Sequence, residues 1–138
     1  MHLIFDANLP RNLSKGLAKL EEGNKKSPNP AIVGHVYDHM AENATDEEII
    51  ITAGQKEWIV ITQDLGFGRI EHEFILLKQH KVSVVFFKPP KKGFCYWDMV
   101  KTFIEKWEEL KEHIKLGDGH CALLIEKTGG IKPLDIVK

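Results

Sequence analysis

Short runs of apolar, β-branched and aromatic residues alternate with helical patterns along most of this chain of 138 residues. The apolar runs fall at residues 3–5, 31–37, 58–62, 82–87 and 121–125, with helix-like spacing of apolar residues between most of them. Strands that are apolar almost throughout, and that alternate with helices, are typical of a parallel sheet covered on both faces. We therefore predict an α/β fold: a three-layer α/β/α sandwich around a central, mainly parallel sheet of about four or five strands.

The length suits one domain, residues 1–138, and no linker-like or low-complexity segment divides it. The motifs described below lie in residues 1–90. Residues 91–138 are predicted to form a long helix, a last strand and a tail that turns back at Gly129 and Gly130 as a short antiparallel segment. A chain of this size can bury roughly two-thirds of its unfolded surface, so it needs no disulfide or structural zinc to fold.

Charge and cysteine content narrow the class of protein. With 19 basic and 20 acidic residues the net charge is -1, which excludes a globally basic nucleic-acid binder but leaves room for a local basic patch. The two cysteines, Cys95 and Cys121, lack metal-ligand spacing, and we expect buried free thiols in a reducing compartment. The first apolar run is too short for a signal peptide and no run of about 18 apolar residues exists. These features predict a cytoplasmic protein without a membrane segment.

Two helices have recognisable start signals. Asn8 is expected to cap a helix in which Pro10 lies in the first turn. Thr45 and Glu48 have the spacing of a capping box, which predicts a helix to about Lys56. The apolar positions of the first helix are Leu9, Leu13, Leu17 and Leu20.

Further along the chain, apolar residues mark two more helices. Ile70, Phe74 and Leu77 indicate a helix after the third apolar run. Two prolines stop the fourth run, and a long helix follows them. Its core face is predicted to contain Met99, Phe103, Trp107, Leu110 and Ile114, and we also assign Trp97 to the core.

Three carboxylates lie where strands end or where the following helix begins. Asp6 directly follows the first apolar run, Asp64 comes two residues after the third, and Asp46 opens the helix after the second. Ligands of open parallel sheets bind at the carboxyl ends of the strands, so all three acids are expected at one edge.

Each of these acids also has a purely structural interpretation. Asp46 and Glu47 in a first helical turn complement the helix dipole. Asp64 suits a turn, because aspartate hydrogen-bonds to nearby backbone. Asp6 is the hardest of the three to explain structurally, and the coincidence of three acids at one edge favours function.

Carboxylates gathered in one cleft raise one another's pKa values, and a divalent cation relieves the repulsion. Oxygen ligands suit Mg²⁺ and Mn²⁺, which can activate water and polarise a phosphoryl oxygen. The seven histidines follow no metal-ligand spacing, and His39, near the predicted edge, is interpreted as a packing residue. The acids therefore point to phosphodiester hydrolysis.

Basic residues fall near the same edge. Arg11, Lys15 and Lys19 recur every four residues on the first helix, Arg69 follows Asp64 by five residues, and Lys91 lies after the fourth run beside Lys88 and Lys92. A solvated surface explains any one of them. Together they could steer a polyanion towards the acids, with Arg11, Lys15, Arg69 and Lys91 as candidate nucleic-acid contacts.

Three short segments carry a family resemblance: residues 4–13 (IFDANLPRNL), 46–49 (DEEI) and 60–64 (VITQD). In their order and spacing they resemble the PIN-like domain, with the VapC45-like group of toxin ribonucleases as the nearest branch. The resemblance covers about residues 1–90. It implies a metal-dependent ribonuclease that holds Mg²⁺ or Mn²⁺ with Asp6, Asp46 (Glu47 as second choice) and Asp64. It also implies a toxin paired with an antitoxin protein, and a homodimer is compatible with it. A fourth acid often stands just beyond the third, where this chain has Gly66.

Two other hypotheses remain open. The missing acid at Gly66 favours a catalytically degenerate PIN-like module that binds RNA or protein. A phosphotransfer fold also places aspartates at strand ends, but the phosphatase pattern needs an aspartate at position 8, where this chain has Asn8.

Overall fold

The computed structural model describes residues 1–67, 71–93, 95–117, 122–126 and 130–133, without the side chains of residues 71, 72 and 74. A six-stranded sheet in the order β2-β1-β3-β4-β5-β6 forms its centre, and only the β5–β6 pair is antiparallel. This confirms the predicted α/β class and the mainly parallel sheet. The strands are β1 (His2–Phe5), β2 (Ile32–His35), β3 (Trp58–Thr62), β4 (Ser83–Lys88), β5 (Ala122–Glu126) and β6 (Gly130–Pro133).

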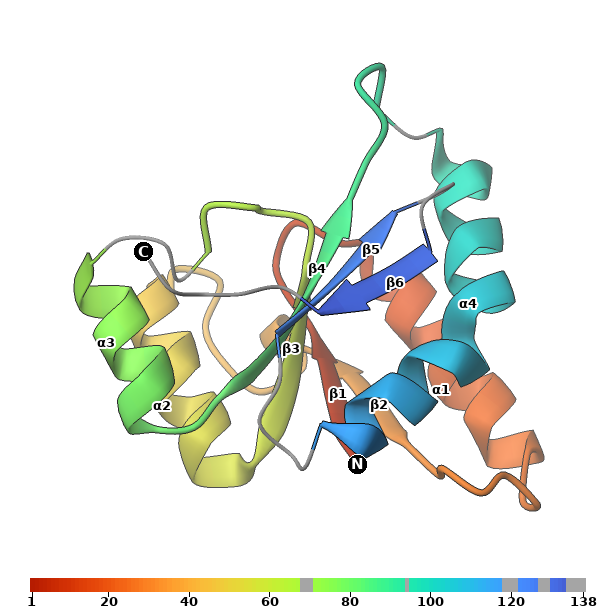
Figure 1. Ribbon diagram of the computed structural model, residues 1–138, viewed down its shortest axis with the longest axis horizontal. Helices are drawn as coiled ribbons and strands as arrows, with labels where there is room; N and C mark the ends of the chain where they lie inside the picture. The colour runs from red at the N-terminus through yellow and green to blue at the C-terminus, as the bar shows by residue number, and fades with distance from the viewer. Residues whose placement is uncertain (68–70, 94, 118–121, 127–129, 134–138) are drawn as a thin grey trace.

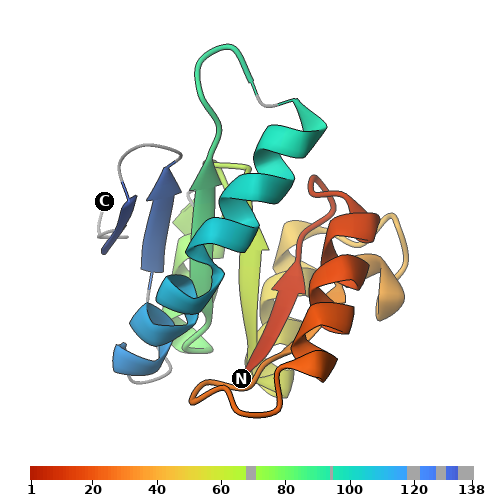
Figure 2. The same ribbon diagram turned by 90° about the vertical axis from the view of Figure 1, so that its right-hand side faces the viewer.

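Helices cover both faces of the sheet, as the three-layer prediction requires. Figures 1 and 2 show helices on either side of the sheet, with the strands between them. The layer on one face contains α1 (Arg11–Gly23) and α4 (Tyr96–Leu116); the opposite layer contains α2 (Asp46–Lys56) and α3 (Glu71–Gln79), and a short 3-10 helix, η1 (Val36–Asp38), follows β2.

Each face of the sheet has its own apolar core. On the α1–α4 face, Phe103 of α4 packs between Phe5 and Phe87, with ring centroids 5.3 and 4.3 Å away. On the α2–α3 face, Val60 and Phe86 are buried against α2 residues Ile50 and Ala53 and other apolar side chains. All five residues of β3 are buried, because this strand is covered on both sides.

A buried ion pair joins α1 to α4 near their carboxyl ends. The Lys111 side chain has no exposed surface and pairs with Glu21 and, at 2.6 Å, with Glu108. The Trp107 indole Nε1 also donates to Glu21, at 3.3 Å. A buried charge is tolerated when it is paired and hydrogen-bonded. This network therefore holds α1 and α4 together near their carboxyl ends, at one end of the seam between the two helices.

Most sequence-based element assignments are confirmed. The Thr45 hydroxyl accepts from the Glu48 backbone N–H, and Glu48 accepts from the Thr45 N–H, so the capping box starts α2 as expected. The predicted core face of α4 is buried, from Met99 to Ile114. The strand expected at 31–37 ends earlier, because Val36 and Tyr37 belong to η1.

Two assignments of side chains to the core are wrong. Trp97 is 67% exposed, although it fits a helical apolar pattern. Leu20, one of the apolar positions of the first helix, is 60% exposed. Cys95 is exposed as well, since it lies just before α4 rather than under it. Cys121 and Ile70, and the side chain of Phe74, lie outside the described residues.

Asn8 is not the cap of the first helix. Pro10 occupies the N-cap position of α1 and makes no side-chain cap hydrogen bond. The Asn8 side chain instead reaches across to the end of β3. Among the described residues, no helix is both long and apolar enough to cross a membrane.

Candidate active site

Asp6 and Asp64 lie at the point where the strand order of the sheet reverses. The chain passes from β1 to β2 on one side and then returns to place β3 on the other side of β1. This is the topological switch point, at which open α/β sheets form a crevice at the carboxyl ends of the strands. Phe5 pairs with Ile61, and the Asp6 N–H donates to the Ile61 carbonyl at 2.8 Å. Asp6 therefore lies beside Thr62, and Asp64 follows two residues later.

The buried Thr62 hydroxyl joins the ends of β1 and β3. It donates to Asp6 Oδ2 at 2.8 Å and accepts from the Asp64 backbone N–H at 3.0 Å. It also accepts from the Asn8 side-chain amide at 3.1 Å. One side chain thus fixes the positions of both strand-end acids. This role of Thr62 has no signal in the sequence, because a threonine inside an apolar run resembles any other β-forming residue.

Asn8 holds the β1–α1 loop against the end of β3. Its Nδ2 atom donates to Thr62 and, at 3.4 Å, to Asp6 Oδ2. Its Oδ1 atom accepts from the Gln63 backbone N–H at 3.1 Å. The Gln63 side chain in turn donates to the Asn8 carbonyl. Asn8 is therefore a positioning residue of this edge.

A second set of contacts braces the same loop from β2. His35, buried at the end of β2, accepts from the Tyr37 N–H through Nδ1 at 3.1 Å. This leaves Nε2 to donate to the Leu9 carbonyl, at 2.9 Å. Asp38 accepts from the His35 N–H and pairs with Arg11 at 2.5 Å. These contacts fix the direction in which the chain leaves β1.

Burial controls the protonation of Asp6. The residue is only 4% exposed, and loss of solvent raises the pKa of Asp6 above its ordinary value. Hydrogen bonds from the Ala7 backbone and the Thr62 hydroxyl oppose this shift, while the charge of Asp64 raises the Asp6 pKa further. Asp6 and Asp64 are thus electrostatically coupled.

Asp46 belongs to the same electrostatic group. Burial, followed by the negative charges of Glu73, Asp6 and Asp64, raises the pKa of Asp46 to about 6. These four residues come from the β1 end, the start of α2, the loop after β3 and the first turns of α3. The structure therefore brings all three predicted acids within range of one another's charge.

Glu73 is an acid that the sequence analysis did not identify. It is buried near the start of α3. Position 66, where the family resemblance suggests a fourth acid, is Gly66, and its N–H donates to Asp64 Oδ1 at 2.9 Å in a turn. A Cβ added at Gly66 would lie 3.2 Å from the same oxygen. Glu73, on a helix, supplies a fourth carboxylate instead. Its distance from Asp64 along the chain does not predict that it lies near the other acids.

The turn interpretation of Asp64 is also confirmed, since its carboxylate accepts that bond from Gly66. The turn occupies Oδ1, and the charge of Asp64 still acts on Asp6 and Asp46. Glu47, the second choice on α2, is exposed. His39 packs against the first residues of β1 and β3, with ring centroids 6.0 Å from His2 and 5.0 Å from Trp58, which places it away from the acids.

The basic residues are distributed unevenly around this edge. Lys91 is exposed in the β4–α4 loop, which extends beyond the carboxyl end of the sheet in Figures 1 and 2. Lys15 is exposed on α1. Arg11 is half exposed but already paired with Asp38. Arg69 lies outside the described residues.

The described residues do not include three or more histidine, cysteine or acidic side chains grouped closely enough to hold one metal ion. The donor chemistry nevertheless suits a hard cation, because four carboxylates are close enough for three of them to raise the pKa of Asp46. Mg²⁺ commonly keeps several water ligands and uses one or two carboxylates, so a closed protein cage is not required.

Comparison with protein families gives one match. Residues 1–89, more than half of the chain, match the model of the PIN like domain. The chain belongs to the PIN-like domain family. Members of this family are generally nucleases, and they usually use divalent metals. No match is found among curated proteins or among solved structures.

Proposed function

We propose that this protein is a metal-dependent endoribonuclease, with Asp6, Asp46 and Asp64 as its catalytic acids and Mg²⁺ or Mn²⁺ as its cofactor. The observation that carries the proposal is the gathering of acids at the switch point, where Thr62 joins Asp6 to Asp64. The raised pKa of Asp46, caused by burial and by the charges of Glu73, Asp6 and Asp64, supports it. Acids without a shared task are rarely gathered at one sheet edge, because their repulsion costs stability.

Asp6 and Asp64 are the best-positioned ligands, since Thr62 fixes both, with Asp46 and Glu73 completing the set and Glu47 as an outer alternative. When bound, the ion would polarise a phosphoryl oxygen of RNA and activate a water for attack on the phosphorus. Asp46 would help to hold the ion, and its pKa of about 6 in the absence of metal leaves it mostly ionised at neutral pH. Lys15, Lys91 and Arg69 are proposed to contact the RNA backbone, with Arg11 after exchange of its Asp38 partner.

The direct test is cleavage of a mixed single-stranded RNA by purified protein, with and without Mg²⁺ or Mn²⁺. Wild-type protein is expected to cleave only with the metal, and Asp64→Asn to lose about a hundredfold or more. Cleavage by Glu73→Gln and by Glu47→Gln shows whether the buried fourth acid or the exposed acid on α2 contributes to activity. Glu105→Gln, on the exposed surface of α4, is the matched control for loss of a carboxylate.

A thermal melt tests metal binding without an activity assay. Saturating Mn²⁺ should raise the melting temperature of the wild type, since a ligand at about 100 times its Kd adds about 2.7 kcal/mol. Asp6→Asn should lose this response without a loss of stability in the absence of metal, because repulsion at the site falls. A wild type indifferent to Mn²⁺, together with a destabilised Asp6→Asn, would contradict the metal-site proposal.

The second candidate is a PIN-like module that binds RNA or protein without cleavage. The lack of a closed group of metal ligands among the described residues favours it. RNA binding that is unaffected by metal and by Asp64→Asn, with no cleavage under any condition, would select this alternative.

We further propose that the nuclease is the toxin of a type II toxin–antitoxin pair, of the VapC45-like kind, in the cytoplasm. The resemblance of residues 4–13, 46–49 and 60–64 supports this role. Induced expression should arrest growth of a bacterial host, and Asp64→Asn at equal protein level should not. A small antitoxin encoded beside the gene should relieve the arrest. Growth arrest that persists in Asp64→Asn would separate toxicity from nuclease chemistry.

A further inference from the structure

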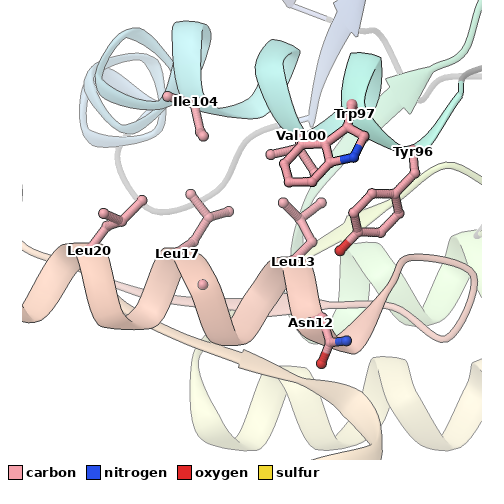
Figure 3. A pocket seen from close by; sticks show the side chains of 9 residues that line it. Asn12, Leu13, Leu17, Leu20, Tyr96, Trp97, Val100 and Ile104 are labelled. Carbon is pink, nitrogen blue, oxygen red and sulfur yellow. The ribbon is translucent and has the colours of Figure 1, made fainter.

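An exposed apolar groove runs between α1 and α4 at the end of the seam nearest the acids. Its volume is about 220 Å³, and its walls are mostly apolar. An engineered protein cavity of about 150 Å³ is enough to hold benzene, so this groove has room for side chains of a partner. Figure 3 shows Leu13, Leu17 and Leu20 of α1 pointing towards the α4 side chains across the gap. The lining residues are Asn12, Leu13, Gly16, Leu17, Leu20, Tyr96, Trp97, Val100 and Ile104.

The groove concentrates the apolar surface that the fold leaves uncovered. Among the described residues, eight large apolar side chains are exposed, and four of them line this groove: Leu20, Tyr96, Trp97 and Ile104. Single exposed apolar residues are ordinary, whereas a contiguous patch of them marks an interaction site. Tryptophan and tyrosine are also the residues most often found to dominate binding energy at interfaces.

The structure shows why the groove stays open at one end only. Near the carboxyl ends of α1 and α4, Lys111, Glu21 and Trp107 close the seam. Nearer the amino ends, Gly16 has no side chain to fill the space, and a Cβ added there would meet nothing within 4 Å. The groove is therefore open beside Gly16, and the ion-paired end of the seam is closed.

The rim of the groove is basic although the whole protein is slightly acidic. Lys15 and Lys19 lie on α1 within one turn of Asn12 and Gly16, and Lys101 lies on α4 between Trp97 and Ile104. Lys19 has Glu22 at 3.6 Å, while Lys15 and Lys101 form no ion pair within the described part of the chain. An occupant with negative charges beside its apolar anchors would match this rim.

We propose that this groove docks an amphipathic helix of a partner protein, with aliphatic or aromatic anchors on one face and acidic residues beside them. The α1 wall from Asn12 to Leu20 is about 12 Å long, which is about two helical turns. A helix presents anchors at positions i, i+4 and i+7 over this length. The apolar walls favour a protein over RNA, which would need polar contacts along its backbone. The inference does not depend on nuclease activity.

The test is a selection of a phage-displayed library of helical peptides, each of about 16 residues, against the full-length protein. Enriched peptides are expected to combine apolar anchors with aspartate and glutamate, and to bind at least about tenfold more weakly to Trp97→Ala and Ile104→Glu. Ile75→Glu is the matched control, because Ile75 is a helical isoleucine with 53% exposure against 52% for Ile104. Thermal melts of the three variants confirm that each is folded.

The other occupants give different results. A dimer in sedimentation that Ile104→Glu dissociates would show that a second copy covers the groove. Binding of a single-stranded oligouridine that Trp97→Ala weakens, without peptide enrichment, would assign the groove to nucleic acid. Either result, or peptides that bind Ile104→Glu as well as wild type, would overturn the proposal. None of these measurements uses RNA cleavage, so loss of the nuclease proposal would leave this one intact.

Discussion

The switch-point edge and the α1–α4 groove depart from the ordinary distribution of residues in opposite ways. At the edge, Asp6, His35 and Thr62 are polar and buried; along the groove, Leu20 and Trp97 are apolar and exposed. The buried polar groups are held by a dense set of hydrogen bonds, whereas the exposed apolar groups have little to hold them. Both arrangements cost stability, and such departures are expected where a protein functions. The difference indicates chemistry at the edge and recognition along the groove.

The largest expected difference lies within one helix. Leu17→Ala should lower the free energy of unfolding by about 3 kcal/mol, because Leu17 is 3% exposed and its loss leaves a cavity. Leu20→Ala should cost less than about 0.5 kcal/mol, since this side chain is already in solvent. Urea denaturation of both variants measures the comparison. Equal losses would show that Leu20 belongs to the core and that the groove is closed in solution.

The next effect concerns the polar edge. Thr62→Val keeps the shape of the side chain but removes the hydroxyl that bonds Asp6, Asn8 and Asp64, and should cost about 2 kcal/mol. Thr102→Val is the matched control, because within the described residues this buried hydroxyl bonds the Asp98 carbonyl of its own helix and no side chain. We expect the control to cost less than about 1 kcal/mol by the same denaturation assay. Similar costs at both sites would reduce Thr62 to an ordinary buried threonine.

Asp46→Asn should raise the stability of the protein, whereas the preceding substitutions lower it. The pKa of Asp46 is raised from 3.8 to about 6, so the folded protein binds this proton more tightly than the unfolded chain. Stability therefore falls as pH rises from about 4 to 6, and the penalty is complete above that range. Removing the charge should add about 1 kcal/mol at pH 7, after allowance for partial exposure, and nothing below about pH 4.

The control for Asp46→Asn is Glu47→Gln, which loses the same favourable interaction with the helix dipole but is exposed. It should cost about 0.3 kcal/mol at pH 7. Thermal melts of both variants between pH 3 and pH 8 provide the measurement. A destabilised Asp46→Asn at pH 7 would mean that the four carboxylates do not repel one another as the structure indicates.

The smallest expected effect is that of the Arg11–Asp38 pair. Arg11 donates to Asp38 and lowers the pKa of this carboxyl below 3.8 in the folded protein. The pair therefore stabilises the protein above about pH 3.8. This stabilisation is lost as the pH falls through the pKa of Asp38 in the folded protein. Arg11→Gln should cost less than about 1 kcal/mol at pH 7, because both side chains are partly exposed. Melts at pH 7 and at pH 2 measure it. A large loss would make this pair, rather than Thr62, the main support of the β1–α1 loop.

Local sequence patterns were sufficient for the fold and for part of the candidate site. Apolar runs predict strands and the capping box predicts the start of α2, because these features depend on residues a few positions apart. The positions of Asp6, Asp46 and Asp64 at one edge follow from the parallel topology, since strand ends in such a sheet share a side. Their role as metal ligands stays a prediction.

The sequence by itself therefore determined the order of elements, the parallel sheet and the edge at which acids collect. Only the tertiary structure decided which helix faces which. That packing brings Glu73 of α3 to Asp46 of α2, and it buries Thr62 and His35 among polar partners. It also leaves Trp97 in solvent, although its pattern matches a core residue. Burial depends on neighbours that are distant along the chain, and spacing along one helix cannot report whether another element covers its far side.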